Sequence, residues 1–448
     1  MTLPAHSSPN QPAATVSPHP LARRVDWDSV TAEAVATLSR YIRVDTSHPA
    51  GQTADAAALL QELLAAEGIE TRLYETPVAG KVNLVAHLRS DAPVGKPFVL
   101  SNHMDVVQAI AADWTFDPYS GEVANGHVYG RGALDMKGMG VMELMAFVQL
   151  KRLRVPLVRD VVLLCTCDEE IGSTLGAHWL VDNYFADLDP AFVLDEGGHG
   201  VRGVFSAGDV FEISVGEKRI LWLTMVARAE PGHASQPWPE AATHRLVRAA
   251  HAILAQPPED RECPPVAELI QRLGPAAKRE IMAQRATAPM LHDTISLTML
   301  SGGYKVNIIP ERAEMTFDCR LLPDTDDRAF LSNLEQIVND PGVTFQVARS
   351  PDPPATSPWV DAPLFAALDQ ACRAYAPRAP VTPTICVGGT DARYFRARGV
   401  PAYGLVPGLF TAEDLKGFHG VDERLSIANL RLGTQVVFDV AARVAAAG

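Results

Sequence analysis

The feature that most constrains the fold is an alternation of amphipathic helices with short apolar runs in the first half of the chain. Residues 29–43 and 54–67 carry apolar side chains at helical spacing, and runs rich in β-branched residues follow at 82–88, 98–101, 161–166 and 191–194. Such alternation is typical of an α/β domain with a mostly parallel central sheet. We therefore expect this domain to begin near residue 24 and to extend to 215.

Residues 216–349 follow a different pattern. Strands predicted at 220–228, 294–300, 313–321 and 343–347 are accompanied by helices at 242–255 and 328–339. This pattern predicts a smaller α+β domain inserted between two halves of the first. A Pro-rich segment at 350–358 leads into residues 350–448, which complete the first domain. A chain of 448 residues is also too long for one compact core, so two domains agree with its length.

Charge and hydropathy exclude several classes of partner. The chain has 39 basic and 53 acidic residues, a formal charge of −14 that repels nucleic acids and anionic membrane surfaces. No apolar run approaches the roughly 20 residues that span a bilayer. Residues 1–23 contain mainly small and polar side chains without the apolar core of a secretion signal, so we expect a disordered tail on a cytoplasmic protein.

Cysteines indicate neither disulfides nor a metal site. The six cysteines include no CxxC pair, which argues against a disulfide framework. Cys165 and Cys167 alternate within an apolar run, and this spacing favours buried small hydrophobic side chains over metal ligands.

Acidic and histidine side chains follow three of the predicted strands directly. His103 and Asp105 come after the run at 98–101, an acidic cluster at 168–170 follows 161–166, and Asp195 and Glu196 follow 191–194. In open α/β sheets the ligand crevice lies beyond the carboxyl ends of the strands, so these clusters should meet. Two further groups lie in predicted loops before helices: residues 130–138, with Asp135, and residues 419–423, which begin with a histidine.

Carboxylates and imidazoles gathered in one crevice repel one another unless a cation neutralises them. Their combination of nitrogen and oxygen ligands suits zinc or a neighbouring first-row divalent ion. Asp105 lies two residues beyond His103 on the same strand face, where it can accept the second ring N–H of that histidine and fix its tautomer.

The ordered motifs resemble those of a family of hydrolases that contains aminoacylases, glutamate carboxypeptidases and succinyl-diaminopimelate desuccinylases. They are HMDVV from His103, GRGALDMKG from Gly130, DEEIG from Asp168, LDEG from Leu194, GHAS from Gly232, NIIP from Asn307 and HG from His419. The match runs in order from about residue 27 to 447. The LDEGG and GGTDARY motifs, and extra length between residues 257 and 292, are more similar to the aminoacylase and carboxypeptidase-S branch.

The resemblance implies a zinc-peptidase-like catalytic domain with two zinc ions, for which Co²⁺ or Mn²⁺ can substitute. Asp135 would bridge the ions, and Glu169 would act as general base on the water between them. Both Asp195 and Glu196 remain candidates at one position, and motif register favours Glu196. The implied metal ligands are His103, Asp135, Glu170, Glu196 and His419.

The resemblance also assigns roles within the predicted insert, which would be a dimerisation or lid domain. His233 would polarise the scissile carbonyl in the active site of the partner subunit of a homodimer. Asn307 and Arg320 would bind the carboxylate of the substrate, for which a guanidinium has the matching planar geometry. Gly389, in the turn at 388–391, would contact substrate through its backbone; a plain turn is the alternative there.

The expected function is metal-dependent hydrolysis of the amide bond of an N-acyl amino acid or a small peptide with a free carboxylate. Three alternatives remain. The first is a dipeptidase or desuccinylase of the same family. The second is a non-catalytic metal-binding or regulatory protein that retains the fold, against which the presence of Glu169 argues. The third is a synthase that runs the reaction in reverse, although amide hydrolysis is favourable in water. The sequence motifs do not indicate which acyl group or amino-acid side chain the enzyme selects, because loops form the walls of the substrate pocket.

Overall fold

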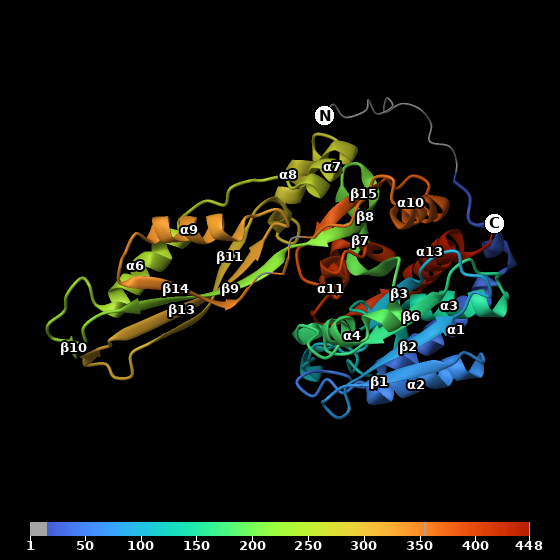
Figure 1. The fold of residues 1–448 in the computed structure, drawn as a ribbon, viewed down its shortest axis with the longest axis horizontal. Coiled ribbons are helices and arrows are strands. Elements are labelled where there is room, and N and C mark those ends of the chain that lie inside the picture. Colours follow the sequence, from blue (N-terminus) through green and yellow to red (C-terminus); the bar gives the residue numbers. More distant parts are fainter. Residues whose placement is uncertain (1–15, 351, 354, 448) are drawn as a thin grey trace.

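The computed structural model describes residues 16–350, 352–353 and 355–447. Two lobes are visible in Figure 1, each built around its own sheet. The larger sheet has eight strands in the order β1-β2-β6-β3-β7-β16-β8-β15. Their bounds are β1 Thr71–Glu75, β2 Val82–Leu88, β3 Phe98–His103, β6 Val161–Thr166, β7 Phe192–Phe205, β8 Gly208–Glu217, β15 Val381–Cys386 and β16 Ala402–Thr411.

The centre of the larger sheet is parallel, as predicted for an α/β domain. Strands β6, β3, β7 and β16 are parallel neighbours, whereas β1, β2 and the β7–β8 hairpin introduce antiparallel pairs. These central strands are buried on both faces, which explains why they appear in the sequence as continuous apolar runs. Cys165 and Cys167 are buried, as predicted.

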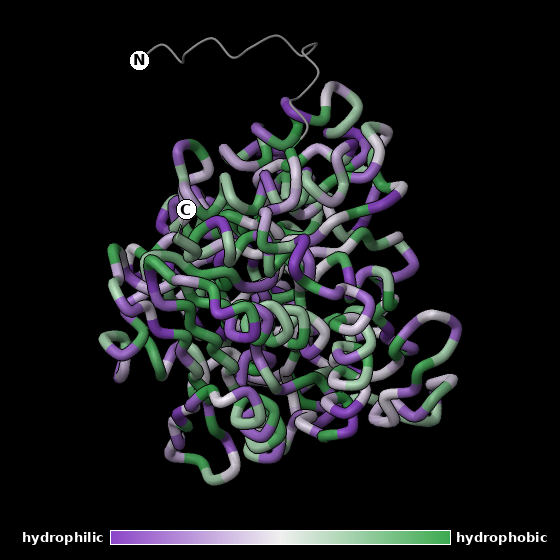
Figure 2. The backbone as a smooth tube through the Cα atoms, turned by 90° about the vertical axis from the view of Figure 1, so that its right-hand side faces the viewer, coloured by the Kyte–Doolittle hydropathy of each residue, from purple (hydrophilic) through white to green (hydrophobic). Residues whose placement is uncertain are grey.

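Helices cover both faces of the larger sheet (Figure 1). One core cluster joins its first face to α1 Trp27–Ile42, α2 Ala54–Ala66, α3 Lys137–Arg152, α10 Pro363–Tyr375 and α13 Ile427–Ala445. A second cluster joins the other face to α4 Ala177–Asn183, α5 Phe185–Leu188 and α11 Ala392–Ala397. In Figure 2 hydrophobic segments gather toward the interior of the molecule and hydrophilic ones lie on outer loops.

The smaller lobe, which we call the lid, contains a four-stranded antiparallel sheet in the order β11-β13-β9-β14. Its strands are β9 Arg219–Arg228, β11 Thr294–Gly302, β13 Arg312–Leu321 and β14 Val343–Arg349. Helices α6 Ala242–Leu254 and α9 Asp327–Val338 pack on it around a separate core. Its far tip is formed by the short strands β10 Gly232–His233 and β12 Ile308–Ile309 (Figure 1).

One part of the predicted insert packs on the larger sheet. Helices α7 Pro264–Leu273 and α8 Ala277–Met282, and the 3-10 helix η4 Ala288–Leu291, share a core with β7, β8 and β15. They lie at the junction of the two lobes in Figure 1. Both helices are amphipathic, but that pattern does not indicate which sheet covers the apolar face.

The remaining short elements lie around the carboxyl end of the larger sheet and at the chain start. They are the sheet β17-β5-β4 (β4 Val123–Ala124, β5 His127–Tyr129, β17 Arg424–Ser426), α12 Ala412–Leu415, and the 3-10 helices η1 Pro20–Arg24, η2 Ala111–Asp113 and η3 Glu169–Ile171. None of the described helices is both long and apolar enough to cross a membrane.

The first described residues differ from the disordered tail predicted for 1–23. Residues 1–15 lie outside the described part, but η1 is ordered because Ala22 is buried and the His19 backbone N–H donates to the carboxylate of Asp439. Arg443 also donates to the carbonyl of Ser17. These contacts to α13 cannot be seen in the composition of the segment.

Candidate metal centre and active site

The carboxylate of Asp135 lies between two histidines. Its Oδ1 is 3.1 Å from Nε2 of His103, and its Oδ2 is 3.1 Å from Nε2 of His419. His103 ends β3, Asp135 lies in the loop before α3, and His419 lies in the loop between α12 and β17. A carboxylate with one oxygen directed to each side is suited to bridge two divalent ions.

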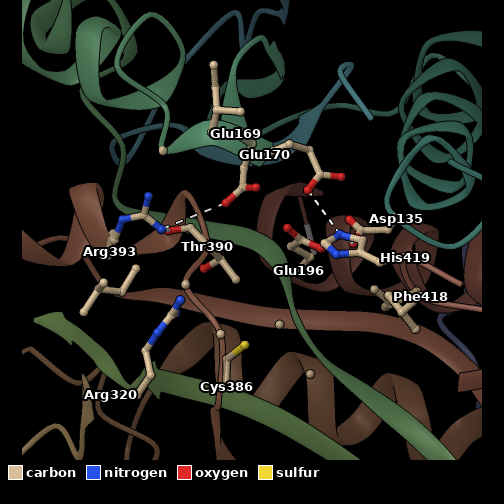
Figure 3. Close-up of a pocket in the computed structure, with 18 of the residues that line it drawn as sticks. Asp135, Glu169, Glu170, Glu196, Arg320, Cys386, Thr390, Arg393, Phe418 and His419 are labelled. Carbon is tan, nitrogen blue, oxygen red and sulfur yellow. Dashed lines mark hydrogen bonds and ion pairs between the residues drawn. The ribbon is translucent and has the colours of Figure 1, made fainter. Parts of the chain in front are cut away.

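Two further carboxylates complete the two halves of this cluster (Figure 3). Glu196 Oε1 lies 3.5 Å from Nε2 of His103, and Glu170 Oε2 lies 3.2 Å from Nε2 of His419. Ligand atoms of His103, Asp135 and Glu170 all lie within 4.8 Å of one another. The five residues predicted as metal ligands are therefore brought together, His103 with Glu196 on one side of Asp135 and His419 with Glu170 on the other.

The electrostatics of this cluster fit a pair of bound cations. Burial raises the pKa of Glu196 to about 7, and hydrogen bonds to Asp135 and Glu170 raise the pKa of His419 to about 10. The buried Oε1 of Glu170 has no hydrogen-bond partner among the described residues. Neutral imidazoles and carboxylates are zinc ligands, so the donor set suits two zinc ions, held by the five residues named above.

The structure separates the adjacent acids Asp195 and Glu196. Because side chains alternate along β7, Glu196 faces His103, whereas Asp195 is fully buried and lies near Asp391 on α11's side of the sheet. Burial, followed by the charge of Asp391, raises the pKa of Asp195 well above its usual range. This geometry favours Glu196 as the ligand.

Glu169 occupies a different place from its neighbour Glu170. Its carboxylate lies near His103 and Glu196, and its Oε1 is 3.9 Å from Nη1 of Arg393, whereas Glu170 faces His419 (Figure 3). Burial raises the pKa of Glu169 well above its usual range, opposed by the charges of His103 and Arg393. Glu169 could be grouped with His103 and Glu196 as a ligand. However, its neighbour Glu170 is the carboxylate that contacts His419, and the position of Glu169 near Arg393 suits a proton acceptor beside the metals.

Asp105 contacts His103 through its backbone. The Asp105 carbonyl accepts from Nδ1 of His103 at 2.9 Å, whereas its carboxylate Oδ1 is 3.7 Å from that nitrogen. The hydrogen bond that sets the tautomer of His103 is therefore made by the carbonyl, in place of the predicted carboxylate. The carboxylate instead accepts the backbone N–H groups of Glu169 and Glu170, each at 3.2 Å.

Glu423 is a site residue whose role the sequence did not reveal. Its fully buried carboxylate accepts three backbone N–H groups of the loop that carries Asp135, from Gly132, Leu134 and Asp135, at 2.7–3.1 Å. It also accepts from Nη1 of Arg131 at 2.6 Å. Burial raises the pKa of Glu423 to about 7, against the charge of Arg131. The sequence placed Glu423 in a polar loop, and its nearness to His419 was the one available signal.

We expect Glu423→Ala to destabilise the protein strongly. The change removes the only carboxylate paired with the buried Arg131 among the described residues, and the acceptor of three loop N–H groups, a loss of about 3–5 kcal/mol for a broken buried pair. The midpoint of thermal unfolding should fall by several degrees. The shift is about 2–4 °C per kcal/mol in mid-sized proteins and is smaller in longer chains such as this one. Glu413→Ala, which removes an exposed ion pair with Lys416, is the control and should leave the midpoint unchanged. Equal midpoints for the two variants would contradict this role.

Arg393 is a second residue that was not singled out. Its Nη1 donates to the carbonyl of Thr390 at 2.8 Å, and its Nη2 donates to the Tyr394 hydroxyl at 3.0 Å. These contacts hold the guanidinium on the cavity wall beside Glu169 (Figure 3). Its motif, GGTDAR, was recognised in the sequence, but only the glycines were interpreted.

A cavity of about 550 Å³ opens beside the predicted metal ligands and reaches the base of the lid. Arg320 of β13 and Gly389 both line it, as the predicted substrate-binding roles require. Arg320 also makes a bidentate pair with Asp318, at 2.6 and 3.0 Å. A Cβ added at Gly389 would lie 2.8 Å from Nη1 of Arg393, so a larger residue there would displace this guanidinium.

His233 and Asn307 lie elsewhere. They meet at the lid tip, where β10 pairs with β12 and the Ala234 N–H donates to the Asn307 carbonyl at 3.2 Å. The His233 side chain is exposed, and neither residue is among the described residues that line the cavity. Figure 1 places this tip at the end of the lid away from the larger sheet. Within one chain, these two predicted residues are therefore separated from the other nine.

Comparisons with known proteins agree with this architecture. Pig aminoacylase-1 (Sus scrofa) is 30% identical over 408 residues, covering 90% of this chain and 93% of that protein. The M20 family metallo-carboxypeptidase Sso-CP2 of Sulfolobus solfataricus superposes with a TM-score of 0.68 at 20% identity, covering 91% of this chain and 98% of that one. A Bacillus subtilis structure described as a dinuclear metal binding peptidase gives a TM-score of 0.61 at 14% identity, covering 92% and 98%.

A family model also matches most of the chain. The model of peptidase family M20/M25/M40 aligns with residues 99–443, which include every residue of the acidic cluster, the lid and the cavity wall discussed above. Together with the aminoacylase-1 alignment, this match confirms the family that the motifs indicated. The chain is therefore a member of peptidase family M20/M25/M40.

Proposed function

We propose that this protein is a two-zinc amidohydrolase that cleaves N-acyl amino acids, or small peptides with a free carboxylate. The observation that carries the proposal is the arrangement around Asp135, with a histidine on each side and Glu169 next to the cluster but directed at Arg393. A binding protein would need the metal ligands, but it would have no use for a free carboxylate held beside them. The similarity to aminoacylase-1 supports the choice of substrate class.

Different residues of the chain have different roles in the proposed hydrolysis. Two bound zinc ions would lower the pKa of a water molecule toward neutrality and polarise the amide carbonyl. Glu169 accepts a proton from the attacking water and then delivers it to the departing amine nitrogen. Arg393 limits where the Glu169 carboxylate can lie. Arg320 and the backbone at Gly389 orient the substrate on the cavity wall.

The proposed active unit is a homodimer in which His233 and Asn307 enter the site of the partner. Strand β11 supports this assembly because it is an edge strand of the lid sheet and is largely exposed. Met299 and Leu300 are 66% and 69% exposed, and Tyr304 and Val306 beyond them are more exposed still. An uncovered edge strand with large apolar side chains is a surface that another strand can pair with.

The cytoplasmic location expected from the sequence stays a prediction.

A substrate screen tests this proposal directly. The zinc-loaded protein should release amine from some N-acyl amino acids, and amides of the same compounds should react poorly because they lack the carboxylate for Arg320. Dipeptides and N-succinyl diacids included in the panel test the dipeptidase and desuccinylase alternatives. Absence of hydrolysis across a panel of varied acyl chains and side chains, with two metals bound, would favour a non-catalytic protein.

Metal removal should abolish hydrolysis. We expect the purified protein to bind close to two divalent ions per chain, and activity lost on chelation should return with zinc. His103→Ala should reduce metal content, whereas His127→Ala, a histidine on β5 outside the cluster, should leave it unchanged. Metal content is measured by elemental analysis. Full activity of metal-stripped protein would refute the two-zinc site.

A further inference from the structure

A histidine outside the predicted site, His48, contacts the carboxylate of Asp105. Ser47 forms a parallel bridge with Val106, and the His48 backbone N–H donates to the Val106 carbonyl at 3.1 Å. These contacts align the segment after α1 with the residues that follow β3. His48 is thereby placed beside Asp105, 57 positions away in the sequence.

The imidazole of His48 binds the Asp105 carboxylate. Nε2 of His48 lies 2.8 Å from Oδ2 of Asp105, and the two side chains are 11% and 0% exposed. The ring is also closely enclosed. Gly51 has φ +52°, and a Cβ there would lie 2.5 Å from Cε1 of His48, so the glycine leaves the space that the ring occupies. His48 therefore has a built position with its Nε2 directed at Asp105.

The same carboxylate holds the turn that carries the proposed base. Oδ1 of Asp105 accepts the N–H of Glu169, and Oδ2 accepts the N–H of Glu170 in addition to the imidazole of His48. Nδ1 of His103, which donates to the Asp105 carbonyl, lies 3.7 Å from Oδ1 of the same residue. Any rotation of the carboxylate toward His103 would weaken its hold on the turn.

We propose that His48 is a positioning residue for the hydrolytic site. Its ring N–H holds the Asp105 carboxylate in the rotation that accepts both N–H groups of the turn, and the turn in turn orients Glu169 and Glu170. The inference rests on the proposed function, in which Glu169 is the general base and Glu170 is a metal ligand. It adds a residue that touches neither substrate nor metal, and that lies in none of the motifs discussed above.

The test compares two substitutions of similar size in the full-length, zinc-loaded protein. His48→Gln places an amide N–H near the position of Nε2, whereas His48→Met fills the space without a donor. We expect kcat of His48→Met to fall about 10- to 100-fold, the scale of a small misplacement of a catalytic group, with KM changed less than about threefold. His48→Gln should recover most of kcat. A purely structural role would not produce this split between kcat and KM with rescue by glutamine.

Metal retention gives a readout that does not depend on turnover. Because Glu170 lies on the same turn, His48→Met should lose one of its two zinc ions to a chelator at a lower concentration than wild type, and His48→Gln should resemble wild type. If the wild-type protein hydrolyses nothing, the proposed function fails, but this comparison still decides whether His48 positions the turn.

His48→Asn covers the case in which His48→Met does not fold. Its amide ends near the position of Nδ1 and cannot reach Asp105, so we expect it to be impaired like His48→Met. Wild-type kcat and zinc retention in His48→Met or His48→Asn would overturn the inference. Equal impairment of the Gln and Met variants, with unchanged melting temperatures, would also overturn it, because the N–H donor would then not matter.

Discussion

Glu169→Gln should lower kcat by about 10²- to 10⁴-fold while the protein keeps both metals, because this is the usual contribution of a general base. Glutamine has the shape of glutamate but cannot accept the proton of the attacking water. The Glu169 side chain faces Arg393, and Glu170 is the carboxylate that contacts His419, so replacement of Glu169 should leave the ligands in place. The measurement is kcat for the best substrate of the screen, together with zinc content by elemental analysis.

Glu170→Gln is the matched control, since it makes the same chemical change one residue along the chain. Glu170 faces His419 and supplies a proposed ligand oxygen, so its replacement should weaken the binding of one zinc ion. Loss of a zinc from Glu169→Gln, with two retained by Glu170→Gln, would show that the roles within the pair are reversed. The grouping of Glu169 with His103 and Glu196 within 4.8 Å makes this a real alternative.

Mixed dimers should regain activity that neither parent has. His233 lies at the lid tip and not on the cavity of its own chain, so each site would combine Glu169 of one chain with His233 of the other. Homodimers of Glu169→Ala and of His233→Ala should both be nearly inactive. After random exchange of equal amounts, about half of the dimers are mixed and each has one intact site of two, so activity should return to roughly a quarter of wild type.

Exchange has to be verified for this result to be informative. Two differently tagged forms of Glu169→Ala, mixed in the same way, provide the control and should stay inactive, while native mass spectrometry counts the mixed dimers. If His233 acted within its own chain, every site would carry one lesion and no activity would return. That outcome would refute the shared site while leaving the two-zinc hydrolase intact.

Local sequence was sufficient to predict the parallel centre of the larger sheet and the residues at its carboxyl ends. Strands buried on both faces require continuous apolar runs, and the chain must become polar where such a strand ends, so His103 and the acids after β6 were recognisable. Parallel strands deliver these ends to one edge, and this predicted their convergence. The strands of the lid were predicted in the same way, from alternating side chains such as those of β13.

Only the tertiary structure decided which groups meet across the fold. Glu423 binds the N–H of Leu134 from 289 positions away, and neither spacing nor composition records such a contact. The carbonyl of Asp105 took the place predicted for its carboxylate, because backbone and side chain of one residue compete for the same imidazole. The apolar faces of α7 and α8 pack on the larger sheet, and this contact also joins segments that are far apart in the sequence. Sequence periodicity fixes which face of an element is buried, but the partner of that face depends on packing between segments far apart in the chain.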